Sequence, residues 1–269
     1  MLINASKRLE TDKKFDGDES SVGFSNYFFL RLVARRRAFT KVDFRYTIFD
    51  TCYIRDCRFD SCDFTGCRFI GTNLRGSKFS GCKFDYAIFE RTSVDADILD
   101  TECPGHENLK AAFARTLRTN YQQLGDADAA NKAIRVELQA TEVHLYKAWS
   151  SNESYYRKHY KGLSRLISFF EWLKFKALDF VWGNGESAIR LCLSALFVLC
   201  LMAIFDVWNF GDPLRVGSYI KSFANALEIF LGVLAPDNYA KWYLATITLV
   251  RFISIGFFLS IFIKRFNRR

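Results

Sequence analysis

The sequence predicts a multidomain membrane protein in which a repetitive solenoid precedes a helical hairpin and two membrane spans. Three observations support this fold class. Apolar residues recur at every fifth position over residues 39–99, a helical pattern begins at Glu107, and two long apolar stretches lie in the final third of the 269 residues. Half of the residues are hydrophobic and only 3 are proline, which excludes a disordered or collagen-like chain.

The amino-terminal segment, residues 1–21, is polar and contains no apolar stretch of the kind found in secretory signal peptides. We therefore expect the chain to begin in a reducing, cytosolic compartment, in which its 8 cysteines do not form a disulfide framework. The net charge of +9 comes from 38 basic and 29 acidic residues. This weak excess suits a membrane surface or nucleic acid without selecting between them.

The strongest signal in the sequence is an internal repeat of five residues. The thirteen positions reached in steps of five are all apolar: Phe39, Phe44, Phe49, Ile54, Phe59, Phe64, Phe69, Leu74, Phe79, Phe84, Phe89, Val94 and Leu99. Small side chains stand two residues before most of them: Val42, Thr47, Cys52, Cys57, Cys62, Cys67, Thr72, Ser77, Cys82, Ala87 and Thr92. Neither helix nor strand periodicity gives this register. We expect a chain that turns a corner every five residues and directs one large and one small side chain inward on each face.

This pattern resembles that of the pentapeptide-repeat family. The resemblance implies a right-handed quadrilateral β-solenoid of about three coils over residues 39–99, with caps at both ends because each coil is buried only by its neighbours. We place the solenoid and its N-terminal cap at residues 22–103. The candidate cap is residues 22–38, although Phe24 and Phe29 keep the five-residue register and could belong to the first coil.

The repeat carries five cysteines, Cys52, Cys57, Cys62, Cys67 and Cys82. Zinc sites pair cysteines about two to four residues apart on turns, so we expect these thiols to pack as small hydrophobic side chains and to hold no metal. The sequence also contains no nucleophile elbow, P-loop or dinucleotide fingerprint. We therefore expect neither an enzyme activity nor a cofactor.

The charges of the repeat argue against a nucleic-acid function. Some members of the pentapeptide-repeat family mimic DNA, which requires a negatively charged surface. Residues 39–99 instead contain nine basic and nine acidic side chains. The basic cluster at residues 35–37 has no interleaved aromatic residues that could stack on bases. We expect no nucleic-acid partner.

Residues 104–160 predict an α-helical hairpin or linker. Pro104 ends the repeat, and apolar residues then fall on one side of a helix that begins at Glu107. Gly125 is a helix stop signal, and Asp126 is a candidate N-cap for a second helix. The stretch resembles the hairpin that follows the solenoid in pentapeptide-repeat proteins with an ion-channel domain, and a generic linker would look similar.

Residues 161–183 predict an amphipathic helix at the membrane interface, with a core helix as the alternative.

Residues 184–269 predict a transmembrane pore domain with spans at about 189–210 and 242–263, each long enough to cross the hydrocarbon core. Basic residues flank the inner ends of both spans, whereas the connection between them has no basic excess. The positive-inside rule then gives a multi-pass protein of the cell inner (plasma) membrane with both termini cytoplasmic.

The connection between the spans contains a short apolar helix at about residues 218–232, followed by an extended loop. This layout resembles the potassium-channel-like pore domain of two-span tetrameric cation channels, in which non-helical backbone at membrane depth lines water. Segments 182–190 and 253–265 are similar to the corresponding parts of pentapeptide-repeat ion-channel proteins. The resemblance implies a re-entrant pore helix, a homotetramer surrounded by membrane lipid, and monovalent ions as the cargo.

One departure from the family concerns the filter. Potassium channels carry Thr-x-Gly-Tyr-Gly there, whereas the aligned stretch is LGVLAPD, so potassium selectivity is not carried over and we expect a weakly selective or tightly gated pore. The candidate pore or filter residues are Glu228, Gly232, Val233, Leu234, Ala235, Pro236 and Asp237. The candidate gate or hinge residues of the inner helix are Arg251 and Gly256. Glu228 either faces the pore or pairs with a basic residue such as Arg251.

Two functional hypotheses follow. The first is a membrane ion channel whose cytosolic solenoid acts as a sensor or scaffold for an unknown cytosolic ligand or protein partner. The second is a membrane-anchored pentapeptide-repeat scaffold without conduction, in which the two spans only tether the solenoid. They differ in whether the loop after the short helix lines a conducting pathway.

Overall fold

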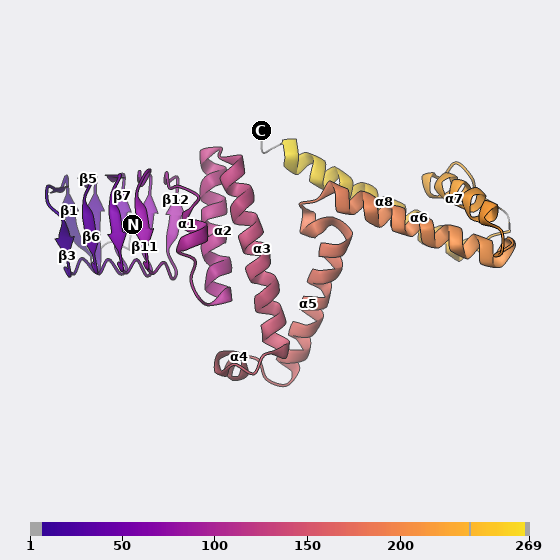
Figure 1. Ribbon diagram of the computed structural model, residues 1–269, viewed down its shortest axis with the longest axis horizontal. Coiled ribbons are helices and arrows are strands. Elements are labelled where there is room, and N and C mark those ends of the chain that lie inside the picture. Colours follow the sequence, from indigo (N-terminus) through magenta and orange to yellow (C-terminus); the bar gives the residue numbers. More distant parts are fainter. Residues whose placement is uncertain (1–6, 237, 267–269) are drawn as a thin grey trace. The chain divides into compact units, whose positions relative to one another are not determined.

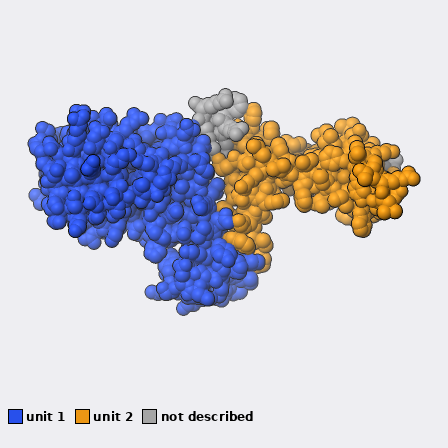
Figure 2. All heavy atoms as spheres, in the orientation of Figure 1, with its two compact units in different colours: residues 1–169, 268 blue, residues 170–267, 269 orange. Residues whose placement is uncertain are grey.

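The structure, a computed structural model, describes residues 7–236 and 238–266. The chain divides into two compact units, one ending in sequence at Phe169 and the other beginning at Phe170 (Figure 2). The first unit holds a β-solenoid and a helical region, and the second holds a set of long helices (Figure 1).

Short parallel strands build the solenoid (Figure 1). They are β1 (Arg8–Thr11), β2 (Lys14–Phe15), β3 (Glu19–Ser20), β4 (Tyr27–Leu30), β5 (Val33–Arg35), β6 (Ala38–Thr40), β7 (Ile48–Asp50), β8 (Tyr53–Arg55), β9 (Arg58–Asp60), β10 (Arg68–Ile70), β11 (Lys78–Ser80) and β12 (Ile88–Glu90). Three faces are sheets with the orders β1-β4-β7-β10-β12, β11-β9-β6-β3 and β2-β5-β8, and isolated bridges join the fourth face. Facing residues such as Phe49 and Phe69 lie twenty positions apart, so four five-residue sides make one turn and the solenoid has about four turns.

Phenylalanine rings stack inside the solenoid. Phe44, Phe64 and Phe84 form one column with ring centroids 5.1 and 5.0 Å apart, and a second column contains Phe49. Of the thirteen repeat positions, Phe79 is partly buried and the others are buried. The small side chains two residues before them are buried as well. The inward pattern expected from the repeat is confirmed, and offset ring contacts add stabilisation beyond area burial.

The solenoid begins earlier than the sequence pattern indicated. Strands β1, β2 and β3 lie within residues 8–20, which we had placed in a polar segment ahead of the solenoid. Phe15 is buried in the same core, but Phe24 follows it by nine positions rather than ten, so the five-residue register breaks there. Glu10 is the register partner of Phe29, so a charged residue occupies a repeat position in this first turn. Residues 22–38 are consequently part of the solenoid rather than a cap.

Four helices follow the solenoid within the first unit: α1 (Ile98–Thr101), α2 (Glu107–Leu124), α3 (Ala127–Ser150) and α4 (Ser154–His159). Gly125 ends α2 in the left-handed conformation with φ 74°. The side chain of Asp126 accepts a hydrogen bond of 2.9 Å from the backbone N–H of Ala129 and caps α3. Phe113 of α2 extends the aromatic core, with its ring centroid 5.6 Å from that of Phe84. The helices thus begin and end where the stop and cap residues indicated.

The remaining helices are α5 (Leu163–Trp182), α6 (Ala188–Phe210), α7 (Val216–Leu231) and α8 (Lys241–Phe266), with a 3-10 turn at Gly183–Gly185 between α5 and α6. Two of these are long and apolar enough to cross a membrane: α6 has a mean hydropathy of 2.5, and the Lys241–Ile263 part of α8 has one of 2.1. The expected spans at 189–210 and 242–263 lie within these two helices.

Candidate functional site

The candidate pore segment lies between α6 and α8 in the second unit. Its short helix, α7, has 16 residues, which gives a length of about 24 Å, less than the hydrocarbon core. It packs against α6 and α8 through a small apolar core formed by Leu199, Met202, Ala203, Ala226, Ile229 and Ile247. Only 22% of the apolar window of α6 and 11% of that of α8 are buried within one chain. Most of both surfaces is therefore available to lipid or to further copies of the chain.

Gly232 ends α7 as a left-handed C-cap. Its φ is 81°, and its backbone N–H donates to the carbonyl of Ile229 at 3.0 Å. The N–H groups of Val233 and Leu234 both donate to the carbonyl of Glu228, at 2.9 and 3.3 Å. These bonds satisfy the last carbonyls of the helix, as C-cap motifs do. The residue that the sequence singled out as a filter glycine is thus required locally for helix termination.

Arg251 lies against Gly232. A Cβ added to Gly232 would collide with Nη1 of Arg251, so the guanidinium occupies the space that the missing side chain leaves. This position is at the carboxyl end of α7, where the helix dipole favours a positive charge. Glu228 is exposed, and among the described residues no ion pair joins it to Arg251. The structure therefore brings Arg251 to Gly232 rather than to the carboxylate of Glu228.

The other predicted pore residues are exposed in one chain. Val233 has an exposed fraction of 78%, Leu234 one of 37%, and Ala235 is exposed as well. Pro236 is half-buried, and Asp237 lies outside the described residues. Gly256 lies within α8, and a Cβ added to it would meet nothing within 4 Å. Packing within one chain therefore does not explain a glycine at this position.

A polar hollow of about 400 Å³ lies between α6, α7 and the loop that leads to α8, and Leu234 and Pro236 of that loop are part of its lining. Asp206 of α6 accepts a hydrogen bond from the hydroxyl of Tyr239, and Lys221 and Asn225 of α7 also line the hollow. Burial raises the pKa of Tyr239, and the neighbouring carboxylate of Asp206 raises it further. Asp206, Lys221, Asn225 and Tyr239 were not among the predicted pore residues. The sequence does contain one signal for this site, because Asp206 is an acidic residue inside an apolar span. Its partner Tyr239 is 33 residues away in sequence, so the pair could not be recognised from local spacing.

An arginine face covers one side of the solenoid. We define it as the side chains of Arg35, Arg36, Arg55 and Arg75. Arg35 and Arg55 are register partners on β5 and β8, and the carbonyl of Arg75 accepts the N–H of Asp56 in the next turn. Within the described part of the chain, none of the four forms an ion pair or a side-chain hydrogen bond. Positive charges thus repeat at about the 4.8 Å spacing of neighbouring strands without an acidic partner.

The solenoid thiols are buried hydrogen-bond donors. The Sγ of Cys67 donates to the carbonyl of Phe44 at 2.8 Å, and burial raises the pKa of this thiol. Burial likewise raises the pKa of Cys52 to about 12. Among the described residues no cluster of three or more His, Cys, Asp or Glu side chains could hold a metal ion.

Comparison with known proteins identifies the repeat. A family model described as pentapeptide repeats matches residues 57–93 in 8 copies. A search of curated proteins found no match.

Solved structures match about a third of the chain. A pentapeptide-repeat protein, Rfr23, from the cyanobacterium Cyanothece 51142 is 13% identical, with 32% of this chain and 60% of that chain covered and a TM-score of 0.29. A trypsin-treated form of QnrB1, a plasmid-mediated fluoroquinolone resistance protein, is 16% identical, with coverages of 34% and 62% and a TM-score of 0.17. A second QnrB1 form is 18% identical, with coverages of 33% and 54% and a TM-score of 0.18. The chain thus spans less than two thirds of each of these proteins. The family match and the observed turns together establish that the chain contains a pentapeptide-repeat β-solenoid.

Proposed function

We propose that the chain is a homo-oligomeric membrane ion channel whose pentapeptide-repeat solenoid serves as a cytosolic sensor or interaction module. The observation that carries the proposal is the order of elements in the second unit. A helix too short to span, α7, packs on the candidate span α6 and is followed by a loop that leads into the second candidate span, α8. Irregular backbone at membrane depth is tolerated where it lines water, which is the arrangement of a channel pore.

An oligomer is part of this proposal. Two spans and one short helix cannot enclose a pathway, so several copies must surround it with closed symmetry, and we propose four. The low burial of α6 and α8 within one chain is consistent with further protein contacts on these helices. Native mass spectrometry of the full chain in detergent should give a tetramer, and a folded monomer would contradict the oligomeric pore.

The loop residues set the proposed conduction properties. Only one glycine stands in the stretch after α7, and Gly232 already serves as its C-cap. Potassium selection needs several rings of backbone carbonyls that point into the pore. Val233, Leu234 and Ala235 are poorly suited to form such rings. Pro236 also restricts the backbone of Ala235 to extended conformations. We propose an apolar constriction that opens by wetting and selects weakly among monovalent cations.

Conductance of the full chain in planar bilayers tests the proposal. Leu234→Ser should raise conductance because a hydroxyl ring wets an apolar constriction, whereas Leu214→Ser, on an exposed residue of the connection before α7, should not. Under a potassium-to-sodium gradient the reversal potential should lie near zero. A value close to the potassium equilibrium potential would contradict the weak selectivity, and a membrane-inserted chain that stays silent in both forms would favour the anchored scaffold.

The arginine face favours a second candidate function, a membrane-anchored scaffold that binds an acidic protein segment. Its four unpaired guanidinium groups lie on the outer side of the solenoid, and anionic side chains would relieve their mutual repulsion. A fluorescent polyglutamate peptide should bind the full chain in a salt-dependent manner. Binding should weaken with Arg55→Glu and persist with Lys83→Glu, on a different face of the solenoid. Equal binding of duplex DNA would contradict the expected lack of a nucleic-acid partner.

A further inference from the structure

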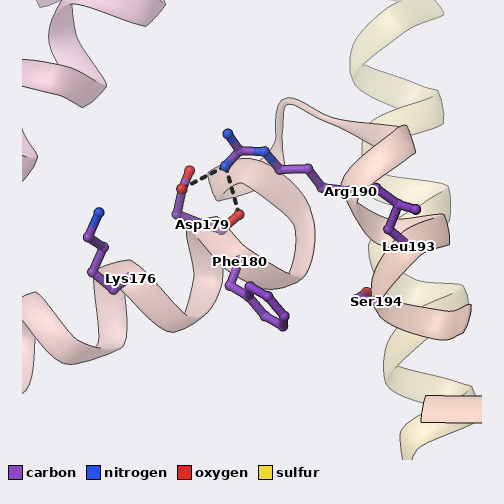
Figure 3. A pocket seen from close by; sticks show the side chains of 6 residues that line it. All are labelled: Lys176, Asp179, Phe180, Arg190, Leu193 and Ser194. Atoms are coloured by element: carbon purple, nitrogen blue, oxygen red, sulfur yellow. Dashed lines mark hydrogen bonds and ion pairs between the residues drawn. The ribbon is translucent and has the colours of Figure 1, made fainter. Parts of the chain in front are cut away.

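Each of the two candidate spans contains one arginine, and the two arginines differ in their partners. Arg190, in the first turn of α6, has a carboxylate within the chain, because its Nη1 lies 2.6 Å from Oδ2 of Asp179 on α5 (Figure 3). Arg251 lies near the middle of the Lys241–Ile263 stretch of α8. Among the described residues, Arg251 forms no ion pair and no hydrogen bond. Its charge is therefore not balanced by a carboxylate of the same chain.

The guanidinium of Arg251 reaches the surface of the chain. The residue is half-buried, and none of its nitrogen atoms is fully buried without a hydrogen bond. Its Cζ lies 5.5 Å from the ring centroid of Phe252, and its Nη1 occupies the space beside Gly232 at the carboxyl end of α7. A ring face and a helix terminus offset only part of the cost of a charge at the centre of a bilayer. A carboxylate from outside the chain would complete this site.

An exposed apolar row runs along α7 on the side opposite its buried residues. This row, which we call the α7 stripe, consists of Ile220, Ala224, Leu227 and Leu231. Their spacing of four, three and four residues places them on one side of the helix, whereas buried residues such as Ala226 and Ile229 lie on the other. Ile220 has an exposed fraction of 70%, and Leu231 has one of 61%. The packing of α7 on α6 and α8 thus leaves the stripe uncovered.

Glu228 borders the α7 stripe. It follows Ala224 by four residues and precedes Leu231 by three, so these side chains are neighbours on the helix surface. Glu228 is exposed and, within the described part of the chain, forms no ion pair. Hydrocarbon alone would cover the stripe but leave this carboxylate unpaired, which is costly at membrane depth. A protein surface that carries a cation satisfies both the stripe and the carboxylate.

We propose that the α7 stripe docks against α8 of a second copy of the chain, so that Glu228 pairs with Arg251 of the partner subunit. The inference rests on the proposed oligomer and identifies the contact between its copies. Each copy supplies one carboxylate and one guanidinium, so closed symmetry pairs every charge around the ring. The guanidinium binds a carboxylate through two parallel N–H groups, which fixes the orientation of the neighbouring copy. An altered docking register would leave both charges unpaired, so the pair specifies the position of the neighbour.

Charge reversal tests the pair by native mass spectrometry of the full chain in detergent. Glu228→Arg and Arg251→Glu each place like charges at every interface, so each variant alone should show an oligomer fraction reduced about tenfold or more. Lys241→Glu is the matched control, because it reverses a charge at an exposed residue of α8 outside the proposed contact. Its oligomer fraction should equal that of the unmodified chain.

Co-expression of the two reversed variants distinguishes a pair between copies from a pair within one chain. When the variants alternate around a ring of four, every interface again joins opposite charges, so mixed oligomers with two copies of each should recover. A pair within one chain would remain repulsive in any mixture. Mixing that restores no oligomer would therefore overturn the proposal, as would single variants that assemble like the unmodified chain.

Glu228→Gln keeps the test decisive if the reversed variants do not fold. This variant retains the shape of the side chain, and its helix content is checked by circular dichroism. It should still weaken the oligomer because Arg251 of the partner subunit loses its carboxylate. A folded Glu228→Gln chain with an unchanged oligomer fraction would overturn the pair. An unmodified chain that is monomeric contradicts the proposed channel as well, whereas an oligomer that is indifferent to Glu228→Gln contradicts only this contact.

Discussion

Asn120 of α2 and Thr92 at the end of the solenoid exchange two hydrogen bonds. The backbone N–H of Thr92 donates to Oδ1 of Asn120 at 2.7 Å, and Nδ2 of Asn120 donates to the carbonyl of Thr92 at 2.8 Å. Both residues are fully buried. The side-chain amide therefore takes the place that the backbone of a further turn would occupy.

The same face of α2 closes the rest of this edge. The N–H of Phe89 donates to Thr116 at 3.0 Å, and the N–H of Arg91 donates to Gln123 at 3.0 Å. Thr116, Asn120 and Gln123 are spaced by four and three residues, so they project from one side of the helix. The hairpin is thus the carboxyl-terminal cap that an open solenoid edge requires.

Replacing Asn120 with alanine should destabilise the cap. The substitution leaves a buried N–H and a buried carbonyl of Thr92 without partners, which we expect to lower the free energy of unfolding by about 3 kcal/mol. Thermal unfolding of the full chain, followed by circular dichroism, measures the change. Gln122→Ala, on the exposed side of the same helix, is the matched control and should change little. Equal losses in the two variants would show that the amide does not close the edge.

The sequence was most informative where a local rule decides the structure. The five-residue register identifies the inward side chains because each turn repeats the same geometry, and Gly125 with Asp126 marks the hairpin because helix termini need local hydrogen bonds. The first turn was missed because Phe15 and Phe24 are nine residues apart. The capping role of Asn120 was missed because a polar residue on a helix is normally solvated.

The candidate site was less predictable because its contacts join distant parts of the chain. The sequence suggested Glu228 as a partner of Arg251, but the guanidinium lies at Gly232, a relation that depends on how α8 packs against α7. The hydrogen bond between Asp206 and Tyr239 has the same origin. Periodicity assigns residues to helices, whereas these pairings depend on the packing of one helix against another.

Burial of Glu102 should make the stability of the solenoid depend on pH. Its side chain is 5% exposed and accepts a 2.6 Å hydrogen bond from the N–H of Cys82, and burial raises its pKa above the ordinary 4.5. Because the folded state holds this proton more tightly, the stabilising contribution is full below pH 4.5 and is lost as the pH rises through the raised pKa.

The Glu102→Gln variant isolates this contribution. The melting temperature of the unmodified chain should fall relative to that of the variant as the pH rises from about 4 to 7, because glutamine does not titrate. Glu107→Gln, at the start of α2, serves as the control for a general charge effect. A constant difference between the unmodified chain and Glu102→Gln across this range would contradict a raised pKa.

The buried thiols should resist alkylation in the folded chain. Thiolates are the reactive species, and burial of Cys52 and Cys67 raises both pKa values while excluding the reagent. Mass spectrometry after treatment with N-ethylmaleimide at neutral pH should find neither residue labelled, and both should be labelled after denaturation. Labelling of either in the native chain, or stoichiometric zinc that is lost in Cys57→Ser, would contradict the packing role.

A charge at the centre of the ring column should prevent the solenoid from folding. Phe64 is 2% exposed and lies between the rings of Phe44 and Phe84. Phe64→Asp would bury an unpaired carboxylate and remove both ring contacts, a loss of more than about 4 kcal/mol. Tyr86→Asp provides a control at an exposed turn, where φ of 59° suits aspartate. Limited proteolysis should degrade the solenoid of the first variant and leave that of the second intact.

Gly232 and Arg251 should be energetically coupled. Gly232→Ala places a side chain at φ 81°, which costs an L-residue about 1 kcal/mol, and its Cβ must also displace the guanidinium of Arg251. The double variant Gly232→Ala/Arg251→Ala keeps the backbone strain but removes the collision. A double-mutant cycle from thermal unfolding in detergent should therefore give a smaller loss for the pair than the sum of the two single losses.

Gly217→Ala is the matched control for this cycle. Gly217 lies in the first turn of the same helix without positive φ, and a Cβ there would meet nothing within 4 Å, so alanine should be neutral or stabilising. If Gly232→Ala behaves like Gly217→Ala, the left-handed cap does not constrain the end of α7. If the losses of the two single variants simply add, Arg251 does not occupy the space beside Gly232, and the helix end is positioned without it.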